Sequence, residues 1–470
     1  MTPLADLIFV TSEDDRYLVK GGIGTAVGTL VKAIGESQPG RRIDWLTESP
    51  TGKRFVERDG NVWRHYVPRH NHHGRLSLSE FASVMGAELK QLVVSRTLGA
   101  PEKRLIIEAA DWEGLAAGYF HEHDDPAILK VSRLHTPLTV CAALNRLRSC
   151  EENELQMARE CRQLCRSDLL SAPTEYILQR TLEEVLHGAN APPESVVIAN
   201  CADVPRYAEL SSERGAALAE LRRLTGLPLP DDAFHIMVLG SLEIRKGTEI
   251  IQRAIPGLMD AIPDCHLTWI GHCAASGDLT ANSKLDAATF YAGIPSQWHH
   301  RVHLAGFIEH ARIPGILAAA NLYALCYLGD NFPGAVLDVA LAGIPLAVLM
   351  RGGIPEMVTD SGECLAFALA DRSETPPEAQ LVKAALQVLA DPVAAGKQAA
   401  RLRDHIASKY AASQISQQLL QVYEQALRKK SGAFAGRPVD PAASHLGASH
   451  SPVDSMRDRL DRASARGVVS

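Results

Sequence analysis

Two aspartates, Asp330 and Asp338, stand eight residues apart in the sequence DNFPGAVLD. The first falls in a turn and the second inside a largely apolar helical segment. An ionised carboxylate among apolar neighbours is costly unless other groups bind to it. A helix cap or a surface salt bridge explains Asp330, but it explains Asp338 less well. The pair is therefore a candidate binding site for groups that pair with carboxylates.

A glycine-rich segment, VKGGIGTAVG (residues 19–28), follows the first expected strand and opens a helix. Gly21, Gly22 and Gly24 let the backbone approach a ligand closely, and a helix N-terminus presents free N–H groups. This combination suits a phosphate. The spacing is not that of the dinucleotide-binding fingerprint, and a purely structural glycine turn explains it equally well.

A second strand, loop and helix pattern, VLGSLEIRKGTEII, places Arg245 and Lys246 just before Gly247 and the start of a helix. Cations at this position can hold an anionic ligand, although a solvated basic pair is an equally good interpretation. His135 ends the apolar strand VSRLH and is followed by a proline-stopped turn. The carboxyl ends of strands in a doubly wound sheet face the ligand crevice, but a single histidine there is more often structural.

The elements that position these residues alternate between short apolar runs and helical patterns. Apolar runs that predict buried strands lie at 4–10, 41–47, 103–109, 127–134, 167–173, 234–240, 265–271, 301–306, 322–326 and 345–350. Between the first two, Val27, Leu30, Val31 and Ile34 recur at helical spacing. Strands that alternate with helices predict parallel β-α-β units, and hence an α/β protein with doubly wound sheets.

The alternation stops at residues 203–232, a charged stretch with several prolines, and then restarts. The sequence therefore predicts one Rossmann-like domain at 1–202, a linker at 203–232 and a second Rossmann-like domain at 233–408. Residues 431–470 are rich in small residues and proline, which predicts a disordered tail.

A helix is expected at residues 409–430, with an apolar stripe of Ile415, Leu419, Val422, Tyr423 and Leu427. Such a stripe must pack on a core, and the pattern alone leaves open which of the two domains supplies it.

The composition is that of a globular protein, with 470 residues, of which 46% are hydrophobic and 22% charged. The formal net charge of −7 argues against general nucleic-acid binding. No signal peptide or transmembrane segment is expected, while peripheral membrane contact stays open. The nine cysteines are scattered without a C-x-x-C pair, as is typical of reduced thiols in a cytoplasmic protein.

Taken together, residues 5–428 resemble the retaining, nucleotide-sugar-dependent glycosyltransferases of family 4, which have the GT-B fold. In that family an E-x7-E element precedes a helix, a Gly-x-Pro, a strand and a G-G-x-x-E turn. The matching positions here are Asp330, Asp338, Ala340, Gly343, Pro345, Gly352, Gly353 and Glu356. The resemblance implies two Rossmann-like domains facing a central cleft, with a C-terminal helix that crosses back to the first domain.

The resemblance implies transfer of a sugar from a nucleotide-diphosphate sugar to a hydroxyl acceptor, in glycan or polysaccharide biosynthesis. Asp330 would hold hydroxyls of the donor sugar, Asp338 the ribose, and Lys246 the phosphates. Backbone amides around Phe332, Pro333 and Gly334 would lie near the sugar and the distal phosphate, and Glu356 would belong to a turn on the nucleotide side.

From the first domain, the resemblance implies that Gly22 touches the diphosphate and that His135 stands at the reaction centre. The sequence contains no Asp-x-Asp, the usual cue for a metal-clamped phosphate, so neither a metal nor another cofactor is expected. Lys246, Arg245 and backbone amides would then stabilise the leaving group. The base and sugar of the donor, and the identity of the acceptor, are not readable from these residues.

This sequence departs from the family pattern in two ways. Both glutamates of the E-x7-E element are aspartates, whose carboxylates reach about 1.5 Å less far. Ser241 stands where the family usually has an arginine, five residues before Lys246. We expect Arg245 to supply the missing phosphate contact.

Three other interpretations stay open. A sugar-nucleotide epimerase can have the same overall fold, although more acid and base groups would be expected around the sugar. The aspartates and Ser241 also fit a catalytically silent subunit that binds sugar nucleotides. Finally, His65, His70, His72 and His73 could hold a metal, but their uneven spacing favours a solvated loop.

Overall fold

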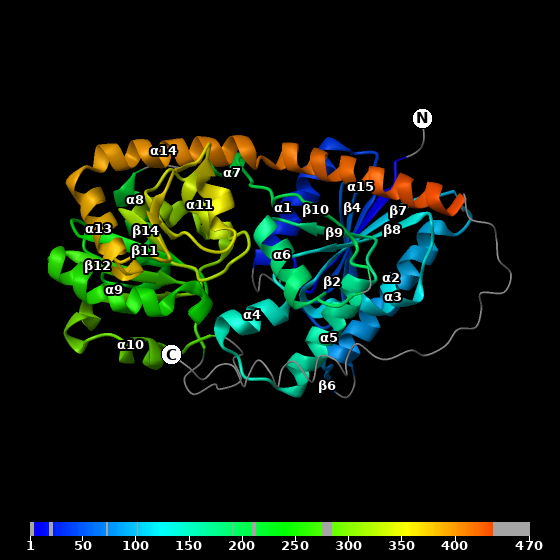
Figure 1. Ribbon diagram of the computed structural model, residues 1–470, viewed down its shortest axis with the longest axis horizontal. Helices are drawn as coiled ribbons and strands as arrows, with labels where there is room; N and C mark the ends of the chain where they lie inside the picture. The colour runs from blue at the N-terminus through cyan, green and yellow to red at the C-terminus, as the bar shows by residue number, and fades with distance from the viewer. Residues whose placement is uncertain are drawn as a thin grey trace.

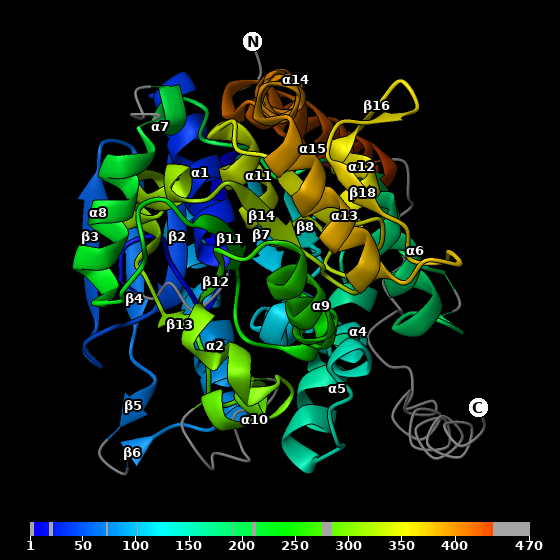
Figure 2. The same cartoon turned by 90° about the vertical axis from the view of Figure 1, so that its left-hand side faces the viewer.

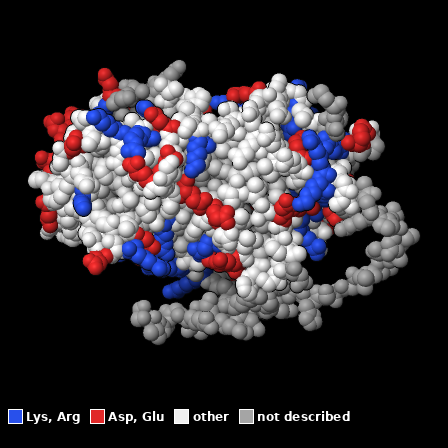
Figure 3. All heavy atoms as spheres, turned by 45° about the horizontal axis from the view of Figure 1, so that its top comes forward, with Lys and Arg blue, Asp and Glu red and all other residues white. Residues whose placement is uncertain are grey.

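A computed structural model describes residues 4–435 apart from 18–21, 72–73, 101, 190, 209–212 and 275–283. Gly21, His72, His73 and residues 436–470 of the expected tail lie outside this part of the chain. Two separate sheets each carry helices on both faces, and they form two lobes side by side (Figure 1). Basic and acidic side chains intermingle over both lobes on the face that Figure 3 displays.

The sheet of the first lobe has eight strands in the order β10-β9-β8-β7-β1-β2-β4-β3, and all neighbours are parallel except β3 and β4. The strands are β1 (Asp6–Val10), β2 (Ile43–Glu48), β3 (Phe55–Asp59), β4 (Val62–Val67), β7 (Leu105–Ala110), β8 (Ile128–Arg133), β9 (Leu169–Ala172) and β10 (Glu194–Val197). Because strand side chains alternate between faces, Leu7 and Phe9 enter one core while Ile8 and Val10 enter another.

Helices cover both faces of this sheet. Helices α1 (Gly22–Ser37) and α15 (Ala412–Ala435) pack on one face, while α2 (Leu78–Thr97) and α3 (Ala117–Glu122) pack on the other. Three more helices follow β8 and β9: α4 (Leu138–Asn145), α5 (Glu151–Cys165) and α6 (Glu175–Glu184). A small hairpin pairs β5 (His70–Asn71) with β6 (Gly74–Arg75).

The second lobe contains a fully parallel sheet in the order β13-β12-β11-β14-β15-β18. Its strands are β11 (Phe234–Leu239), β12 (Cys265–Ile270), β13 (Val302–Gly306), β14 (Leu322–Leu325), β15 (Leu346–Leu349) and β18 (Phe367–Leu369). The chain order reverses between β11 and β14, which is where doubly wound sheets bind ligands.

Figure 2 views the molecule from the side of the second lobe, with helices on both faces of its sheet. One face carries α8 (Arg214–Thr225), α11 (Gly334–Leu341), α12 (Ile354–Val358) and α14 (Pro392–Lys409). The other carries α9 (Thr248–Ala261), α10 (Ala287–Ala292) and α13 (Pro377–Ala390). A hairpin of β16 (Thr359–Asp360) and β17 (Glu363–Cys364) follows α12.

The last two helices run along both lobes, as Figure 1 shows in orange and red. Helix α14 packs in the second lobe, whereas the apolar stripe of α15 packs in the first, where Ile415, Leu419 and Leu427 are buried. Polar contacts add to this packing. The Tyr423 hydroxyl donates to Glu108 (2.6 Å), and Arg41 pairs with Glu424 (2.8 Å). The sequence pattern left the partner open, and the structure assigns it to the first lobe.

The expected strands all occur, but the sequence interpretation omitted β3, β4, β10 and β18 of the two large sheets, as well as the two short hairpins. The strand β3 is largely exposed, and a short edge strand of this kind lacks a long apolar run. Residues 203–232, expected as a linker, contain α7 (Pro205–Ala208) and α8, and α8 contributes Leu218 and Leu221 to the core of the second lobe. No helix within the described residues is sufficiently long and apolar to cross a membrane.

Candidate active site

Arg245 and Lys246 lie on a single turn of 3-10 helix, η2 (Ile244–Lys246), which follows the carboxyl end of β11. Asp330 follows β14, the neighbouring strand across the switch point. Gly247 has a φ of 80°, and a Cβ there would lie 2.0 Å from the Cys326 carbonyl oxygen. Only glycine allows the turn to approach the end of β14 this closely.

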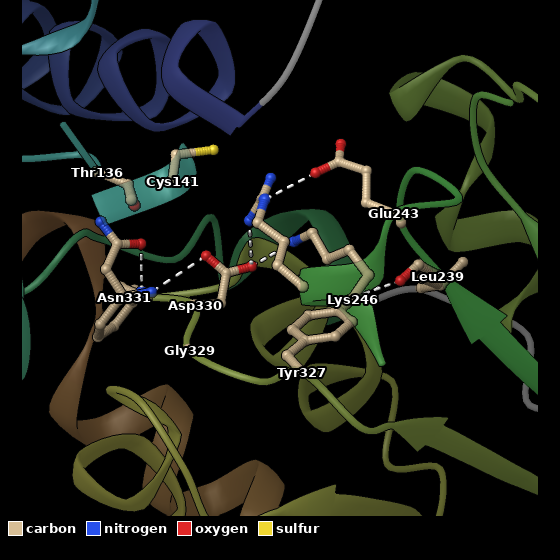
Figure 4. A network of polar contacts seen from close by, with 12 residues as sticks. Thr136, Cys141, Leu239, Glu243, Lys246, Tyr327, Gly329, Asp330 and Asn331 are labelled. Atoms are coloured by element: carbon tan, nitrogen blue, oxygen red, sulfur yellow. Dashed lines mark hydrogen bonds and ion pairs between the residues drawn. The ribbon is translucent and has the colours of Figure 1, made fainter. Parts of the chain in front are cut away.

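Lys246, Arg245 and Asp330 form one ion-paired cluster, in which the side chains of Lys246 and Asp330 point toward each other (Figure 4). The Lys246 ammonium contacts Asp330 Oδ2, and Arg245 Nη1 lies 3.5 Å from the same oxygen. Arg245 Nε also donates to Glu243 Oε2 (2.7 Å). The Asp330 side chain is only 9% exposed, so these charges interact with little screening by solvent.

The surroundings of the cluster fix its charge state. The Lys246 ammonium lies 4.1 Å from the centre of the Tyr327 ring, whose hydroxyl donates to the Leu239 carbonyl. Burial tends to raise the pKa of Asp330, but the charges of Lys246 and Arg245 outweigh burial and hold the pKa below its usual range. Asp330 is therefore ionised and occupies the position between the two cations.

Two glycines behind the cluster set the backbone position of residues 330 and 331. Added Cβ atoms would lie 2.4 Å from the Asp330 carbonyl oxygen at Gly352 and 1.7 Å from the Asn331 carbonyl oxygen at Gly353. The Gly353 amide donates to the Asp330 carbonyl oxygen (2.9 Å). The glycine turn predicted from the sequence thus supports the Asp330 loop by close backbone contact.

His135 reaches the same region from the first lobe. Its backbone amide donates to Asp111 Oδ1 (2.9 Å), and its carbonyl oxygen accepts a hydrogen bond from Asn331 Nδ2 of the second lobe. Asn331 N also donates to Asp330 Oδ1 (3.1 Å). The structure therefore joins His135 to the Asp330 cluster through Asn331.

The imidazole of His135 is held in its neutral form. Burial, together with the nearby charge of Arg133, lowers the pKa of His135 to about 3. Its Nε2 is buried and lacks a hydrogen-bond partner among the described residues. An enclosed ring nitrogen of this kind can bind a polar group of a ligand.

Two buried acids lie behind the His135 loop. Asp111, at the end of β7, accepts from the amides of Trp112 (2.8 Å) and Thr136 (3.2 Å) as well as from His135. Glu160 on α5 accepts from the amides of Glu113 (2.9 Å) and Leu138 (2.6 Å). Burial raises the pKa of Asp111 to about 7, and burial with the charge of Asp111 raises that of Glu160 to about 8.

Asp338 belongs to a different set of contacts. It lies on α11, where its Oδ1 accepts from the Tyr207 hydroxyl (2.5 Å) and its Oδ2 lies 3.3 Å from His310 Nε2. The side chain is 15% exposed. Among the contacts between described residues, none joins Asp338 directly to Lys246 or Asp330.

Glu356 also contacts another element. Its carboxylate accepts from the amides of Glu175 (2.9 Å) and Tyr176 (3.0 Å), which begin α6 in the first lobe. Such a carboxylate satisfies amides that a helix N-terminus leaves without intrahelical acceptors. Glu356 therefore links the two lobes.

The remaining predicted positions lie at helix starts or in the core. Gly22 is the first residue of α1, with open space around its Cα, and Gly334 is exposed at the start of α11. Pro333 precedes α11 as its N-cap, and the buried Phe332 ring packs edge-on against Tyr410. The Phe332 amide bonds to Asn331 Oδ1.

The sequence interpretation missed the polar partners of these residues, Glu243, Asn331, Asp111 and Glu160. Asp111 follows a predicted strand, as His135 does, so its position at the carboxyl end of a strand was a usable signal. Glu160 lies mid-helix, where nothing in the pattern separates it from a solvated residue.

Of the histidines considered for a metal site, the structure describes His65 and His70. His65 Nε2 lies 2.8 Å from Asp44, which also pairs with Arg42 and Arg96. His70 lies on β5. Over the described ranges of the chain, no group of three or more His, Cys, Asp or Glu side chains has an arrangement suited to a metal ion.

Comparison with known proteins finds a family model that matches part of the second lobe. Residues 233–391 match the family model described as "Glycosyl transferases group 1". The 2-deoxystreptamine glucosyltransferase of Streptomyces kanamyceticus is 26% identical over 218 residues, which are 46% of this chain and 52% of that protein. The chain spans about a quarter to about half of the length of the first curated relatives it matches.

Solved structures match nearly the whole chain. A sucrose-phosphate synthase from Thermosynechococcus elongatus has a TM-score of 0.67 and 16% identity, with 90% of this chain and all of that chain covered. Anabaena Alr3699/HepE, solved with UDP and glucose, has a TM-score of 0.60 and 17% identity over 89% of this chain and 99% of that chain. The GT-B fold implied by the resemblance is confirmed, and residues 233–391 match the glycosyltransferase group 1 model.

Proposed function

We propose that this protein transfers a sugar from a nucleotide-diphosphate sugar to a hydroxyl acceptor, with retention of configuration and without a metal ion. The observation that carries the proposal is the cluster of Lys246, Arg245 and Asp330 at the switch point of the second sheet, joined to His135 of the first lobe. The family match of the second lobe and the UDP and glucose in the Anabaena neighbour support it.

In this proposal the donor's diphosphate binds to Lys246 and Arg245. A pyrophosphate takes the place that the Asp330 carboxylate holds between the two cations, and Asp330 then turns to hydroxyl groups of the donor sugar. The ammonium and guanidinium groups stabilise the negative charge that develops on the leaving group.

His135, with its neutral ring and enclosed Nε2, presents a polar atom to the sugar at the point where the lobes meet. Asp338 receives the ribose hydroxyls on α11, and the exposed start of α11 at Gly334 and of α1 at Gly22 supply amides for the phosphates. Glu356, whose carboxylate binds α6, supports the nucleotide side of the site indirectly. Front-face substitution, in which the leaving phosphate helps to deprotonate the acceptor hydroxyl, is the proposed route to retention.

We further propose the division of labour expected from the sequence. Residues 1–202 bind the acceptor, residues 233–408 bind the nucleotide, 203–232 connect them, and 409–430 cross back. The family 4 assignment, a role in glycan or polysaccharide biosynthesis and a cytoplasmic location belong to the same proposal. An acceptor on a membrane surface is compatible with it.

A thermal-shift screen with nucleoside diphosphates and nucleotide sugars tests the proposal. A ligand at 100 times its dissociation constant adds about 2.7 kcal/mol to the free energy of unfolding. We expect one base to stabilise the protein, and the matching nucleotide sugar to be consumed when acceptor hydroxyls are supplied. Binding without turnover over many acceptors would indicate a catalytically silent binding protein, conversion of the sugar without an acceptor an epimerase, and no shift with any nucleotide would refute the proposal.

A further inference from the structure

Helix α4 connects the two parts of the site. Its first residue, Leu138, follows the His135 loop, and its last residue, Asn145, lies against the η2 turn of the second lobe. One short helix thus begins beside the reaction centre and ends beside the cations. A shift of α4 would therefore move both the His135 loop and the η2 turn.

Asn145 makes two hydrogen bonds across the lobe boundary. Its Oδ1 accepts from the Arg245 backbone amide (3.0 Å), and its Nδ2 donates to Glu243 Oε2 (3.2 Å). The second contact matters because Glu243 Oε2 also accepts from Arg245 Nε (2.7 Å). Asn145 therefore contacts the backbone of Arg245 directly and its guanidinium through one shared carboxylate.

The contact is enclosed, which makes it specific. Asn145 is 3% exposed and Glu243 is 5% exposed. A buried carboxamide without hydrogen-bond partners lowers stability more than an exposed one does. The contact between Asn145 and Glu243 is therefore strongly favoured when the two lobes are in contact. Close packing surrounds it, because a Cβ at Gly329 would lie 2.8 Å from Leu144 Cδ2.

We propose that Asn145 is a positioning residue of the donor site. It fixes the η2 turn, and with it Arg245 and Lys246, in the orientation that receives a diphosphate, and it does so only when the first lobe contacts the second. The proposal rests on the function proposed above. It couples closure of the lobes to assembly of the cationic site.

The next residue offers a matched control. Arg146 crosses the same boundary and pairs with Glu249 (2.8 Å), but it does not contact η2. The Arg146 side chain is 64% exposed, so its ion pair contributes little. Arg146→Gln therefore tests attachment of the lobes near Asn145 without changing the contacts of Arg245.

Hydrogen exchange measured by mass spectrometry on the full chain tests, without any ligand, whether Asn145 holds the η2 turn. In Asn145→Ala, amides of the peptide that contains residues 242–248 should exchange at least about fivefold faster than in the wild type. Arg146→Gln should leave that peptide within about twofold of the wild type. Equal exchange in the wild type and in Asn145→Ala would overturn the proposal.

Calorimetric titration with ADP, GDP and UDP then tests the positioning role. We expect the nucleotide that binds the wild type to bind Asn145→Ala about tenfold more weakly, and Arg146→Gln within about twofold. In Asn145→Asp the new carboxylate faces that of Glu243, so this variant should bind the nucleotide still more weakly. Adding Glu243→Gln to Asn145→Asp should raise the affinity for the nucleotide at least about fivefold.

A role of Asn145 in general folding predicts no such recovery, so independent effects of the two replacements would overturn the positioning role. If the wild type binds none of the nucleoside diphosphates of the thermal-shift screen, the proposed function fails and the positioning role fails with it. The exchange measurement still decides whether Asn145 docks η2, so the two failures remain distinguishable.

Discussion

The two lobes bring buried carboxylates to their meeting point in opposite electrostatic settings. In the second lobe, Asp330 is bound by the side chains of Lys246 and Arg245, which hold its pKa below the usual range. In the first lobe, Asp111 and Glu160 are bound mainly by backbone amides, and burial raises their pKa values to about 7 and about 8. Cationic side chains bind the carboxylate of the second lobe, whereas backbone amides of loops bind those of the first.

This difference separates a ligand-binding role from a structural one. Cationic side chains can exchange one anion for another, so the Asp330 carboxylate is replaceable by a diphosphate. Backbone amides that bind Asp111 and Glu160 belong to the loops themselves, so those acids fix the shape of the loops near His135. In the proposed function, the second lobe is therefore the side that responds to the nucleotide, and the first lobe is the side that supplies a fixed surface.

The largest effect is expected for the cation at the centre of this contrast. Lys246→Ala should raise the barrier to turnover of the nucleotide sugar by about 3–4 kcal/mol, which lowers kcat roughly 160- to 900-fold. The measurement is kcat with the donor identified by thermal shift. Lys429→Ala, which removes an exposed pair with Glu194, is the control and should match the wild type. Near-normal turnover in Lys246→Ala would remove the distinction between the lobes.

The acids of the first lobe predict a pH dependence of stability. Their folded pKa values lie above the unfolded values, so their stabilising effect is complete below about pH 4 and is lost as pH rises through the folded values. Between pH 6.5 and 8.5 the free energy of unfolding should fall by on the order of 2 kcal/mol from Asp111 and Glu160. Urea denaturation at several pH values measures it.

Buried histidines have the opposite effect at lower pH, where they make the free energy of unfolding rise with pH. Burial lowers the pKa of His235 and His303 to about 4, so their contribution grows as pH rises toward 6.5. The informative quantity is thus the difference between the wild type and Glu160→Gln, which should lack part of the fall above pH 6.5. Parallel profiles for the two proteins would show that Glu160 does not titrate as stated.

A smaller effect is expected at Asp338, which lies apart from the Lys246 cluster. Asp338→Asn should weaken nucleotide binding about tenfold, because an amide replaces a charged acceptor of ribose hydroxyls. Calorimetry with the ribonucleotide and its 2′-deoxy analogue measures this. Asp338→Asn should lower the affinity for the 2′-deoxy analogue less than the affinity for the ribonucleotide. Equal losses for both ligands would mean that Asp338 serves only its contacts with Tyr207 and His310.

The smallest effect is expected at the contact between Glu356 and α6. Glu356→Ala should cost about 1 kcal/mol of stability, as removal of a helix cap usually does. Thermal unfolding measures it, with Glu363→Ala, which breaks an exposed pair with Arg401, as a control of near-zero effect. A null result at Glu356 would show that the two lobes are held together by other contacts.

The sequence predicted those features that depend on local pattern. Apolar runs gave the central strands, and the glycines at 247, 352 and 353 marked places where a side chain would collide with neighbouring backbone. The proximity of Lys246 to Asp330 followed from the order of motifs. Asn145, Glu160 and Asn331 were not predicted, because their partners lie between about 20 and 200 residues away and no period in the sequence encodes such pairs.

The crossing of α15 has a consequence for synthesis of the chain. The core of the first lobe includes Leu419 and Leu427, and the Ala5 amide bonds to Glu424, 419 residues later. A nascent chain that has emerged only as far as β10 lacks the apolar wall that covers α1. We therefore expect the core of the first lobe to stay incomplete until α15 has been synthesised.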